Sequence, residues 1–305
     1  SFIAVGGGSN IDAAKAVSAA ITRPDKRLQQ LGGLLKVRHK TPLFIAVPTT
    51  AGTGSETTVA AVVTDDATHR KYAINDPVLC PDYAIIDPSL TISLPPGLTA
   101  STGMDALTHA VEAYLNTAYH KKETARLAEE SVTAIMEYLP KAYALGEDIQ
   151  AREEMLIASF KAGVAFTTAC VGNVHAIAHT IGGLYHVPHG LANAVVLPIV
   201  LEDYGEKVYD DLAHLAKISG VSSKGSVKEC AQQFIQAIFD LNKSMGIPEC
   251  LDMICQEDVE QMATWAEKEA NPLYPVPVVY DKKHFEKVIL QVKNYHRRND
   301  EVVVH

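Results

Sequence analysis

Four histidines lie within fifteen residues of one another in the segment VHAIAHTIGGLYHVPHG: His175, His179, His186 and His189. The whole chain has 12 histidines in 305 residues, so random placement seldom produces such a cluster. The neighbouring side chains are mainly apolar, and a neutral imidazole buried among them needs a hydrogen-bond partner or a metal ion. The segment therefore indicates a metal site.

A second pair of candidate ligands, Asp105 and His109, lies in the segment TGMDALTHAVEAY. Their four-residue spacing places both side chains on one face of a helix. Such a pair alone is more often a surface or helix-pairing contact than a metal site. His175 and His179 share a helix face in the same way. Spacing alone therefore favours a site of Asp105, His109, His175 and His179, with His189 outside it.

One carboxylate and three imidazoles suit Fe(II) or Zn(II) and leave the site with net positive charge, so a bound oxygen atom is polarised. The chain contains no HExxH motif and thus lacks the glutamate base of a zincin. Among metal-dependent enzymes, oxidoreduction is therefore favoured over peptide hydrolysis.

Two loops rich in glycine and hydroxyl groups are candidates for binding a nucleotide. The turn GGGS at 6–9 follows an expected strand and opens an expected helix, which Ser9 is predicted to cap together with Asp12. The segment PTTAGTGSE at 48–56 follows another strand, and its small residues let donors approach phosphate or ribose. Each loop alone is equally consistent with a plain turn, and GxGxxG is absent. Together they predict a dinucleotide lying across the sheet edge.

The elements that must position these residues change in character near residue 96. Before it, a helix is expected at 10–21, and strands are expected at 2–5, 43–47, 59–64 and 83–86. This alternation indicates an α/β sheet with strands buried on both faces. After the break LPPG at 94–97, helices are expected at 98–115, 121–139, 150–170, 173–184, 190–202, 208–219, 225–245, 257–268 and 282–294.

Length and composition are consistent with two domains, which we place at 1–96 and 97–305. The formal net charge of -9 argues against a nucleic acid or an anionic membrane as the main partner. No run approaches the ~18 consecutive apolar residues of a membrane span, and the first residues lack the basic region of a signal peptide. We expect a cytoplasmic protein, with further residues before Ser1 because serine is not an initiator.

The chain resembles the iron-containing (group III) alcohol dehydrogenases, which are related to lactaldehyde reductase, butanol dehydrogenase and 1,3-propanediol dehydrogenase. The resemblance is carried by GGGSNIDAAK, PTTAGTGSE, GMDALTHAVEAY and HAIAHTIGGLYHVPHGLANAVVLP, in this order. It implies a dehydroquinate synthase-like architecture, in which an α/β nucleotide-binding domain, here lacking its N-terminal part, precedes an all-helical metal-binding domain. It also implies a homo-oligomer that transfers hydride between NAD or NADP and a small alcohol or aldehyde with Fe(2+), or Zn(2+), as the metal.

The resemblance implies a different fourth ligand, so that the metal ligands become Asp105, His109, His175 and His189. It places His179 near the nicotinamide, where we expect it to act catalytically by relaying a proton, since imidazole titrates near neutrality. The cofactor contacts that it implies are Gly7, Gly8, Ser9, Asp12, Thr49, Thr50, Thr53, Thr58, Lys71 and Leu90.

The chain departs from the family pattern at three places. Thr180 and Thr168 stand where many members have proline and asparagine, respectively. Residues 273–280 do not follow the usual continuation of the asparagine-proline motif, and the N-terminal portion that relatives carry before the GGGS turn is absent from this sequence. Two alternatives stay open: a zinc-dependent enzyme similar to glycerol dehydrogenase, and a truncated, non-catalytic fragment that binds metal. The four-ligand pattern favours the iron-containing branch.

Overall fold

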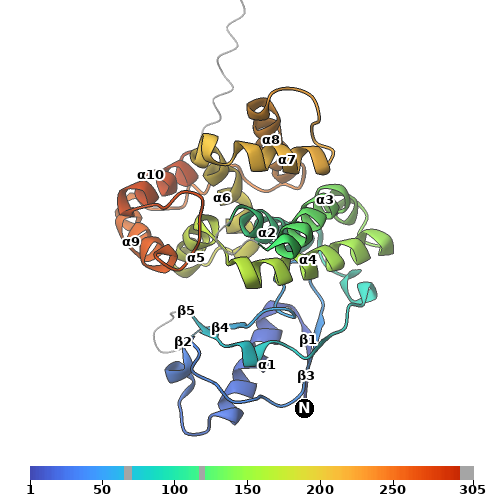
Figure 1. Cartoon of the computed structure of the whole chain (residues 1–305), viewed down its shortest axis with the longest axis vertical. Helices are drawn as coiled ribbons and strands as arrows, with labels where there is room; N and C mark the ends of the chain where they lie inside the picture. Colours follow the sequence, from blue (N-terminus) through green and yellow to red (C-terminus); the bar gives the residue numbers. More distant parts are fainter. Residues whose placement is uncertain (65–70, 117–120, 296–305) are drawn as a thin grey trace, which may run out of the picture.

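The computed structural model describes residues 1–64, 71–116 and 121–295. A small α/β part, blue to cyan in Figure 1, lies below a larger helical part that is coloured from green to red. The predicted fold class, an α/β part followed by helices, is confirmed. The predicted domain boundary falls within the first turn of helix α2 (Pro96–Leu115), and the division into two folding units stays a prediction.

The first sheet is parallel and consists of strands β1 (Phe2–Gly6), β3 (Phe44–Pro48) and β6 (Tyr83–Ala84), in the order β1-β3-β6. Phe2 lies opposite Phe44 and Gly6 lies opposite Pro48, so both strands end at the same edge. Helix α1 (Gly8–Thr22) leaves this edge directly after β1 and buries Ile11 against β1 and β3. The two predicted nucleotide loops therefore begin side by side.

A second sheet has the order β2-β5-β4, with β2 (Gly33–Leu34), β5 (Lys71–Asn75) and β4 (Ala60–Thr64). Strands β4 and β5 are antiparallel, whereas β2 and β5 are parallel. The short 3₁₀ segments of the α/β part are η1 (Leu28–Leu31), η2 (Pro77–Leu79) and η3 (Pro88–Thr91). The four predicted strands are present, whereas β2 and β5 were not predicted.

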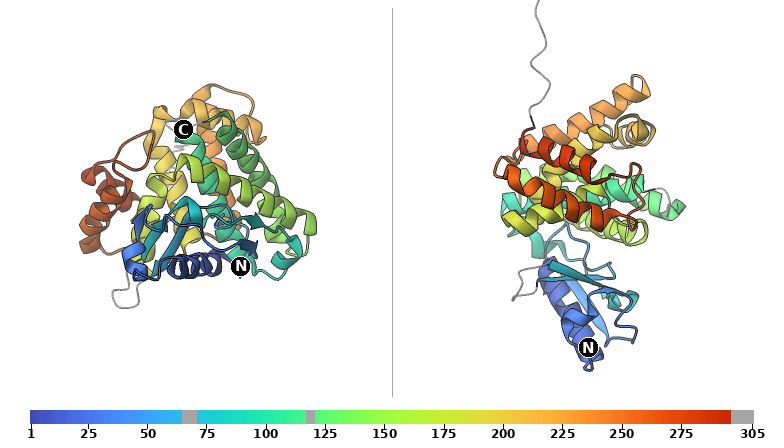
Figure 2. Two further views of the ribbon diagram at one scale, coloured as in Figure 1. Left: turned by 60° about the horizontal axis from the view of Figure 1, so that its bottom comes forward. Right: turned by 90° about the vertical axis from the view of Figure 1, so that its left-hand side faces the viewer.

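Two sequence-based predictions about the α/β part are wrong. Strand β1 is not buried on both faces: its Ile3 and Val5 are 69% and 55% exposed, because α1 packs against the opposite face, whereas β3 is mostly buried. Within the described residues, no side chain caps α1, whose N-cap is Gly7; Ser9 lies inside the helix and Asp12 points to β4 instead. Figure 2 shows α1 beside the sheet from two further directions.

The described helical part contains nine α-helices after α1, one for each predicted helix. After α2 they are α3 (Lys122–Ala144), α4 (Ile149–Ala169), α5 (Asn173–Tyr185), α6 (His189–Tyr204), α7 (Tyr209–Ile218), α8 (Val227–Ser244), α9 (Val259–Ala270) and α10 (Lys282–Lys293). Single 3₁₀ turns occur at η5 (Gly205–Lys207) and η6 (Gln256–Asp258).

Helix α2 lies at the centre of this part and packs against α3, α4 and α6 (Figure 1). Its residues from Gly103 to Leu115 are all buried, as expected of a helix surrounded by others. Helix α5 packs against α6 on one side and α9 on the other. Polar side chains on α2 and α5 are therefore held inside the protein.

In the part of the chain that the structure describes, no single helix is both long and apolar enough to cross a membrane. Helices α4 and α5 satisfy that test only as a pair, with a bend of 104° between them.

Candidate metal centre

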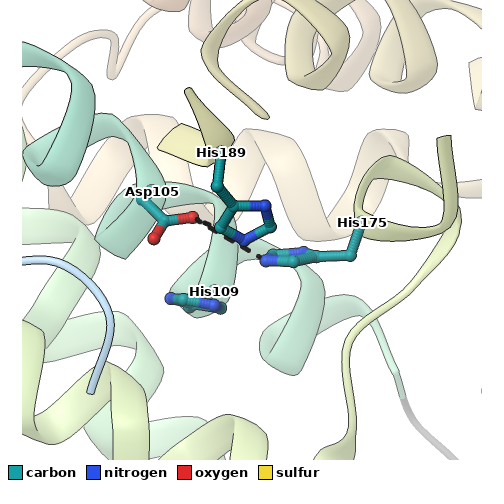
Figure 3. A group of neighbouring side chains, drawn as sticks. All are labelled: Asp105, His109, His175 and His189. Atoms are coloured by element: carbon teal, nitrogen blue, oxygen red, sulfur yellow. Dashed lines mark ion pairs between the residues drawn. The ribbon is translucent and has the colours of Figure 1, made fainter. Parts of the chain in front are cut away.

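Three helices bring four potential ligands together (Figure 3). Asp105 and His109 come from α2, His175 comes from α5, and His189 is the first residue of α6. One potential ligand atom from each residue lies within 4.8 Å of the others. The N-terminus of α6 approaches α2 so closely that a Cβ atom on Gly190 would lie 2.2 Å from the Ser101 carbonyl oxygen. Glycine next to His189 thus permits this approach.

The ring of His109 is held from two sides and by one hydrogen bond. It stacks on Phe166 with centroids 4.1 Å apart and on His175 with centroids 4.6 Å apart. Its Nδ1 lies 3.2 Å from the carbonyl oxygen of Gly52. A carbonyl can only accept, so Nδ1 carries the proton in the neutral ring and Nε2 offers the lone pair. This tautomer is the one needed for an Nε2 metal ligand.

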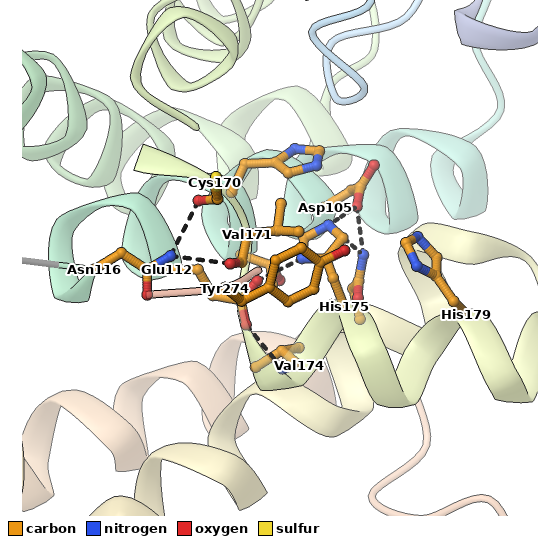
Figure 4. A network of polar contacts seen from close by, with 12 residues as sticks. Asp105, Glu112, Asn116, Cys170, Val171, Val174, His175, His179 and Tyr274 are labelled. Atoms are coloured by element: carbon orange, nitrogen blue, oxygen red, sulfur yellow. Dashed lines mark hydrogen bonds and ion pairs between the residues drawn. The ribbon is translucent and has the colours of Figure 1, made fainter. Parts of the chain in front are cut away.

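The ring of His175 is held by Glu112, a residue that the sequence analysis missed (Figure 4). Its Nδ1 lies 2.6 Å from Glu112 Oε2, and the backbone N–H of Val174 donates to Glu112 Oε1 at 2.8 Å. Burial raises the pKa of Glu112 to about 8, although the backbone hydrogen bonds oppose this shift. Glu112 follows His109 by three residues and Asp105 by seven, so all three side chains lie on one face of the helix. This spacing is the feature of the sequence from which Glu112 could have been predicted to lie at the site.

Asn193 lies among the same groups and was also missed. Its Nδ2 lies 2.7 Å from Asp105 Oδ1, 3.1 Å from His175 Nε2 and 3.2 Å from His189 Nε2. Its buried Oδ1 has no hydrogen-bond partner among the described residues. Asn193 follows His189 by four residues on α6, so both side chains lie on one helix face.

The chemistry of these groups fits a divalent transition-metal ion. Burial lowers the pKa of His109 and lowers that of His175 well below its ordinary value, which keeps both imidazoles neutral. Neutral imidazole is the form that binds a metal. His109 and His175 each use Nδ1 for a hydrogen bond, so their Nε2 atoms stay available to a metal. With one nitrogen of His189 and one oxygen of Asp105 they form a set of three nitrogens and one oxygen, which suits Fe(II) or Zn(II).

His179 lies beside these four residues, one turn after His175 on α5. Its ring stacks on that of His189 with centroids 5.1 Å apart, and its side chain is 41% exposed. It is not a member of the close four-residue group. The structure thus brings together the set that the family resemblance implied, and not the set that helix spacing alone had favoured.

The two predicted nucleotide loops lie next to each other at the ends of β1 and β3. The backbone N–H of Thr49 donates to Gly6 at 3.0 Å. A Cβ atom on Gly8 would come within 2.8 Å of the Thr53 side chain, and one on Gly7 would lie 3.4 Å from Thr50. The close approach of Thr53 therefore leaves no room for a side chain at Gly8, whereas a methyl group at Gly7 would be in ordinary contact with Thr50.

Asp12 and Thr58 lie beneath these loops, both buried. The Asp12 carboxylate accepts the backbone N–H of Val62 at 3.0 Å, and the Thr58 hydroxyl lies 2.9 Å from Lys15 Nζ. In this arrangement they support the loops, and a direct contact with a nucleotide stays a prediction. Of the remaining predicted contacts, Leu90 lies in η3 and is 38% exposed, whereas the side chain of Lys71 is outside the described part.

Lys15 is a further residue that the sequence analysis did not single out. Its fully buried Nζ donates to the carbonyl oxygens of Thr58 and Ala60 at 2.7 and 2.9 Å. These bonds connect α1 to the residues that directly follow the threonine-rich loop, as we call the segment at 48–56. Burial lowers the pKa of Lys15 to about 8, and it raises the pKa of the buried Glu56 carboxyl to about 7.

The threonine-rich loop also contacts the metal centre. A Cβ atom on Gly52 would lie 2.5 Å from the backbone oxygen of Thr102, which shows how closely the loop approaches α2. The same glycine supplies the carbonyl that accepts a hydrogen bond from His109. One residue therefore connects the predicted nucleotide loop with a predicted metal ligand.

Two family models match the chain almost from end to end. The N-terminal match, at residues 1–88, is to "Iron-containing alcohol dehydrogenase", and the second, at residues 99–292, is to "Fe-containing alcohol dehydrogenase family, C-terminal". The chain belongs to the iron-containing alcohol dehydrogenase family. It is thus an oxidoreductase of this class, and the glycerol dehydrogenase-like alternative is not favoured.

Relatives within the iron-containing alcohol dehydrogenase family differ in coenzyme and substrate. The chain is 40% identical to the NAD-dependent methanol dehydrogenase of Bacillus methanolicus, over 86% of this chain and 69% of that protein. It is 40% identical to the NADPH-dependent butanol dehydrogenase of Clostridium saccharobutylicum, over 82% of this chain and 64% of that protein. A solved structure of 1,3-propanediol oxidoreductase matches with a TM-score of 0.90 and 38% identity, over 95% of this chain and 76% of that one.

Proposed function

We propose that this chain transfers hydride between NAD(P) and a small alcohol or aldehyde, with a divalent ion held by Asp105, His109, His175 and His189. The observation that carries the proposal is the convergence of these four ligand atoms within 4.8 Å of one another. Family membership and the contact between Gly52 and His109 support it, because they connect this group to a loop of the expected coenzyme site.

Different residues of the chain are proposed to orient the metal ligands and to bind the coenzyme. When bound, the metal supplies Lewis acidity towards the substrate oxygen, and the nicotinamide accepts or donates the hydride. Glu112 and the Gly52 carbonyl orient the rings of His175 and His109. The turn at 7–9 and the loop at 49–53 offer backbone and hydroxyl donors to the pyrophosphate and ribose.

His179 is proposed to carry the proton between the substrate hydroxyl and solvent. Its ring lies against His189, and its side chain is 41% exposed, so it borders both the metal centre and the surface. Imidazole accepts and releases protons near neutral pH, which suits this task. The hydride and the proton of the alcohol thus leave by separate routes.

The family name favours iron, and zinc is the alternative metal for the same ligand set. The related dehydrogenases named for NAD and for NADPH support either coenzyme for this chain. We also propose a cytoplasmic homo-oligomer, with residues 1–96 and 97–305 as separate domains.

The test is purification without oxygen, followed by metal analysis and assays of butanal and propanal with NADH and NADPH. We expect about one iron per chain, oxidation of one reduced coenzyme, and loss of activity on chelation that Fe(2+) restores. Aldehyde reduction that persists after all metal is removed would overturn the proposal. A fluorescence titration with NADH measures coenzyme binding separately from turnover.

A further inference from the structure

A carboxylate from a distant part of the chain contacts His179. Glu269 lies at the end of α9, ninety residues after His179 on α5, and these two helices pack against each other. Its Oε1 lies 2.6 Å from His179 Nδ1. The Glu269 side chain is 31% exposed, so the contact lies at the border of the site and not on the open surface.

The same carboxylate oxygen is held by a second donor. The hydroxyl of Tyr274 donates to Glu269 Oε1 at 2.8 Å. The segment that carries Tyr274 is fixed in turn, because Asn271 Nδ2 donates to the carbonyl of Tyr280 at 2.8 Å. Glu269 is therefore anchored independently of His179, unlike one partner of a mobile surface ion pair.

This contact selects one form of the His179 ring. A neutral imidazole carries a single N–H, and a carboxylate can only accept, so the proton resides on Nδ1 and Nε2 becomes the acceptor nitrogen. The ring lies nearly parallel to that of His189, with an angle of 16° between the planes. Its orientation beside the four-residue group is thus fixed at two points.

We propose that Glu269, anchored by Tyr274, is a positioning residue that fixes the tautomer and orientation of His179 so that Nε2 is presented to the substrate. This inference rests on the proposed function for the identity of that substrate. It gives a function to Tyr274, which lies in the segment 273–280, where the chain departs from the usual family sequence. Glu269 does not belong to the close ligand group, so the proposal separates it from metal binding.

The main test compares Glu269→Gln with Glu260→Gln in zinc-loaded protein. Glu260 lies on the same helix but pairs with Lys282 at the surface, with 77% of its side chain exposed. Imidazole ¹⁵N–¹H spectra, assigned with His179→Asn, are expected to show a protonated Nδ1 in the wild type and in Glu260→Gln. Glu269→Gln should shift His179 towards the other tautomer. Metal content should stay at the wild-type level in both variants.

Turnover supplies the second measurement, with butanal and NADH as the probes. Glu269→Gln is expected to lower kcat by about 10- to 100-fold with little change in KM, the range that is typical when the hydrogen-bond partner of a metal-ligating histidine is removed. Tyr274→Phe, which leaves His179 and its carboxylate in place, should lower kcat in the same direction but by less. Glu260→Gln should match the wild type.

Three results would overturn this inference: an unchanged His179 spectrum in Glu269→Gln, an unchanged kcat in that variant, or loss of its metal, which would make Glu269 a ligand. If Glu269→Gln unfolds, Tyr274→Phe decides, and a wild-type spectrum together with wild-type kcat then counts against the proposal. If the wild type reduces no aldehyde, the proposed function fails, whereas the spectra still test the role of Glu269.

Discussion

The metal centre and the nucleotide loops depend on opposite properties of their residues. In the metal centre each of two histidine rings is fixed by a partner, Glu112 for His175 and the Gly52 carbonyl for His109. In the loops, close contacts at Gly8 and Gly52 leave no room for a Cβ atom. Removal of side-chain atoms should therefore damage the first region, and addition of them should damage the second.

The two regions also differ in how they are enclosed. Asp105, His109 and His175 are all at most 5% exposed, whereas Ile3 and Val5 on the first sheet are more than half exposed. Helix α2 is surrounded by other helices, but the sheet has α1 against one face. Packing energy thus stabilises the metal ligands more directly than the strands that carry the loops.

Substitution of the proposed ligands should have the largest effect. Asp105→Ala and His189→Ala are each expected to weaken metal binding by more than about 100-fold, because each removes a donor itself and not merely its support. His179→Ala should bind metal like the wild type and lose turnover. Metal titration followed by activity assays measures metal affinity and turnover. If His179→Ala loses the metal and His189→Ala keeps it, the ligand set with His179, which helix spacing favoured, would be the correct one.

Gly52→Ala tests the connection between the two regions. The added methyl group would meet the Thr102 backbone oxygen at 2.5 Å, so the loop or α2 must move, at a cost of about 3 kcal/mol in unfolding free energy. Gly97→Ala is the matched control: its Cβ would meet nothing within 4 Å, and alanine in a helix should be neutral or stabilising by up to about 1 kcal/mol. Equal stability of the two variants in urea denaturation would contradict the close contact.

A pH dependence should originate in the buried Glu56 beneath the loops. Its pKa is raised from 4.5 to about 7, so the folded protein holds a proton that the unfolded chain has lost between these values. The unfolding free energy should therefore fall as pH rises from about 4.5 to 7, by between about 1 and 3 kcal/mol. Denaturation of the wild type and Glu56→Gln across this range measures the contribution, and parallel profiles would exclude it.

Glu112→Gln should have the smallest of these effects. Above pH 8, where the Glu112 carboxyl is ionised, the amide keeps its size but lacks the charge that favours Nδ1–H on His175, so metal affinity measured there should fall by about 10- to 100-fold. Glu129→Gln, which alters a partly exposed carboxylate that contacts His214, is a suitable control. Competition with a metal-binding dye gives both affinities, and an unchanged value for Glu112→Gln would show that ring stacking alone orients His175.

Local patterns predicted most of the fold. Each of the nine helices predicted after the LPPG break is present in the described part of the chain, and in α3, α8 and α10 the apolar residues repeat with the helical period. Strand β2 has only two residues and β5 forms largely by pairing with β4, so neither carries a sufficient local signal. The burial of β1 was predicted wrongly because periodicity records which side chains are apolar, and not which face another element covers.

The site was less predictable for a geometric reason. Spacing rules relate residues on one helix, and they correctly placed Asp105 beside His109 on α2. His189 belongs to another helix, which begins after the chain turns at His186, a residue with a φ of 54°. Asn193 shares a helix face with His189 but resembles many exposed amides in sequence. Only the packing of α6 against α2 brings it to Asp105.

The packing of α9 against α5 has an optical consequence. Trp265, the one tryptophan of the sequence, lies on α9 four residues before Glu269 and is 38% exposed. Emission from this indole reports on that helix alone, without overlapping signals from other tryptophans. Reduced nicotinamide absorbs light at the wavelengths that tryptophan emits, so energy transfer from Trp265 would time the arrival of the coenzyme without any attached label.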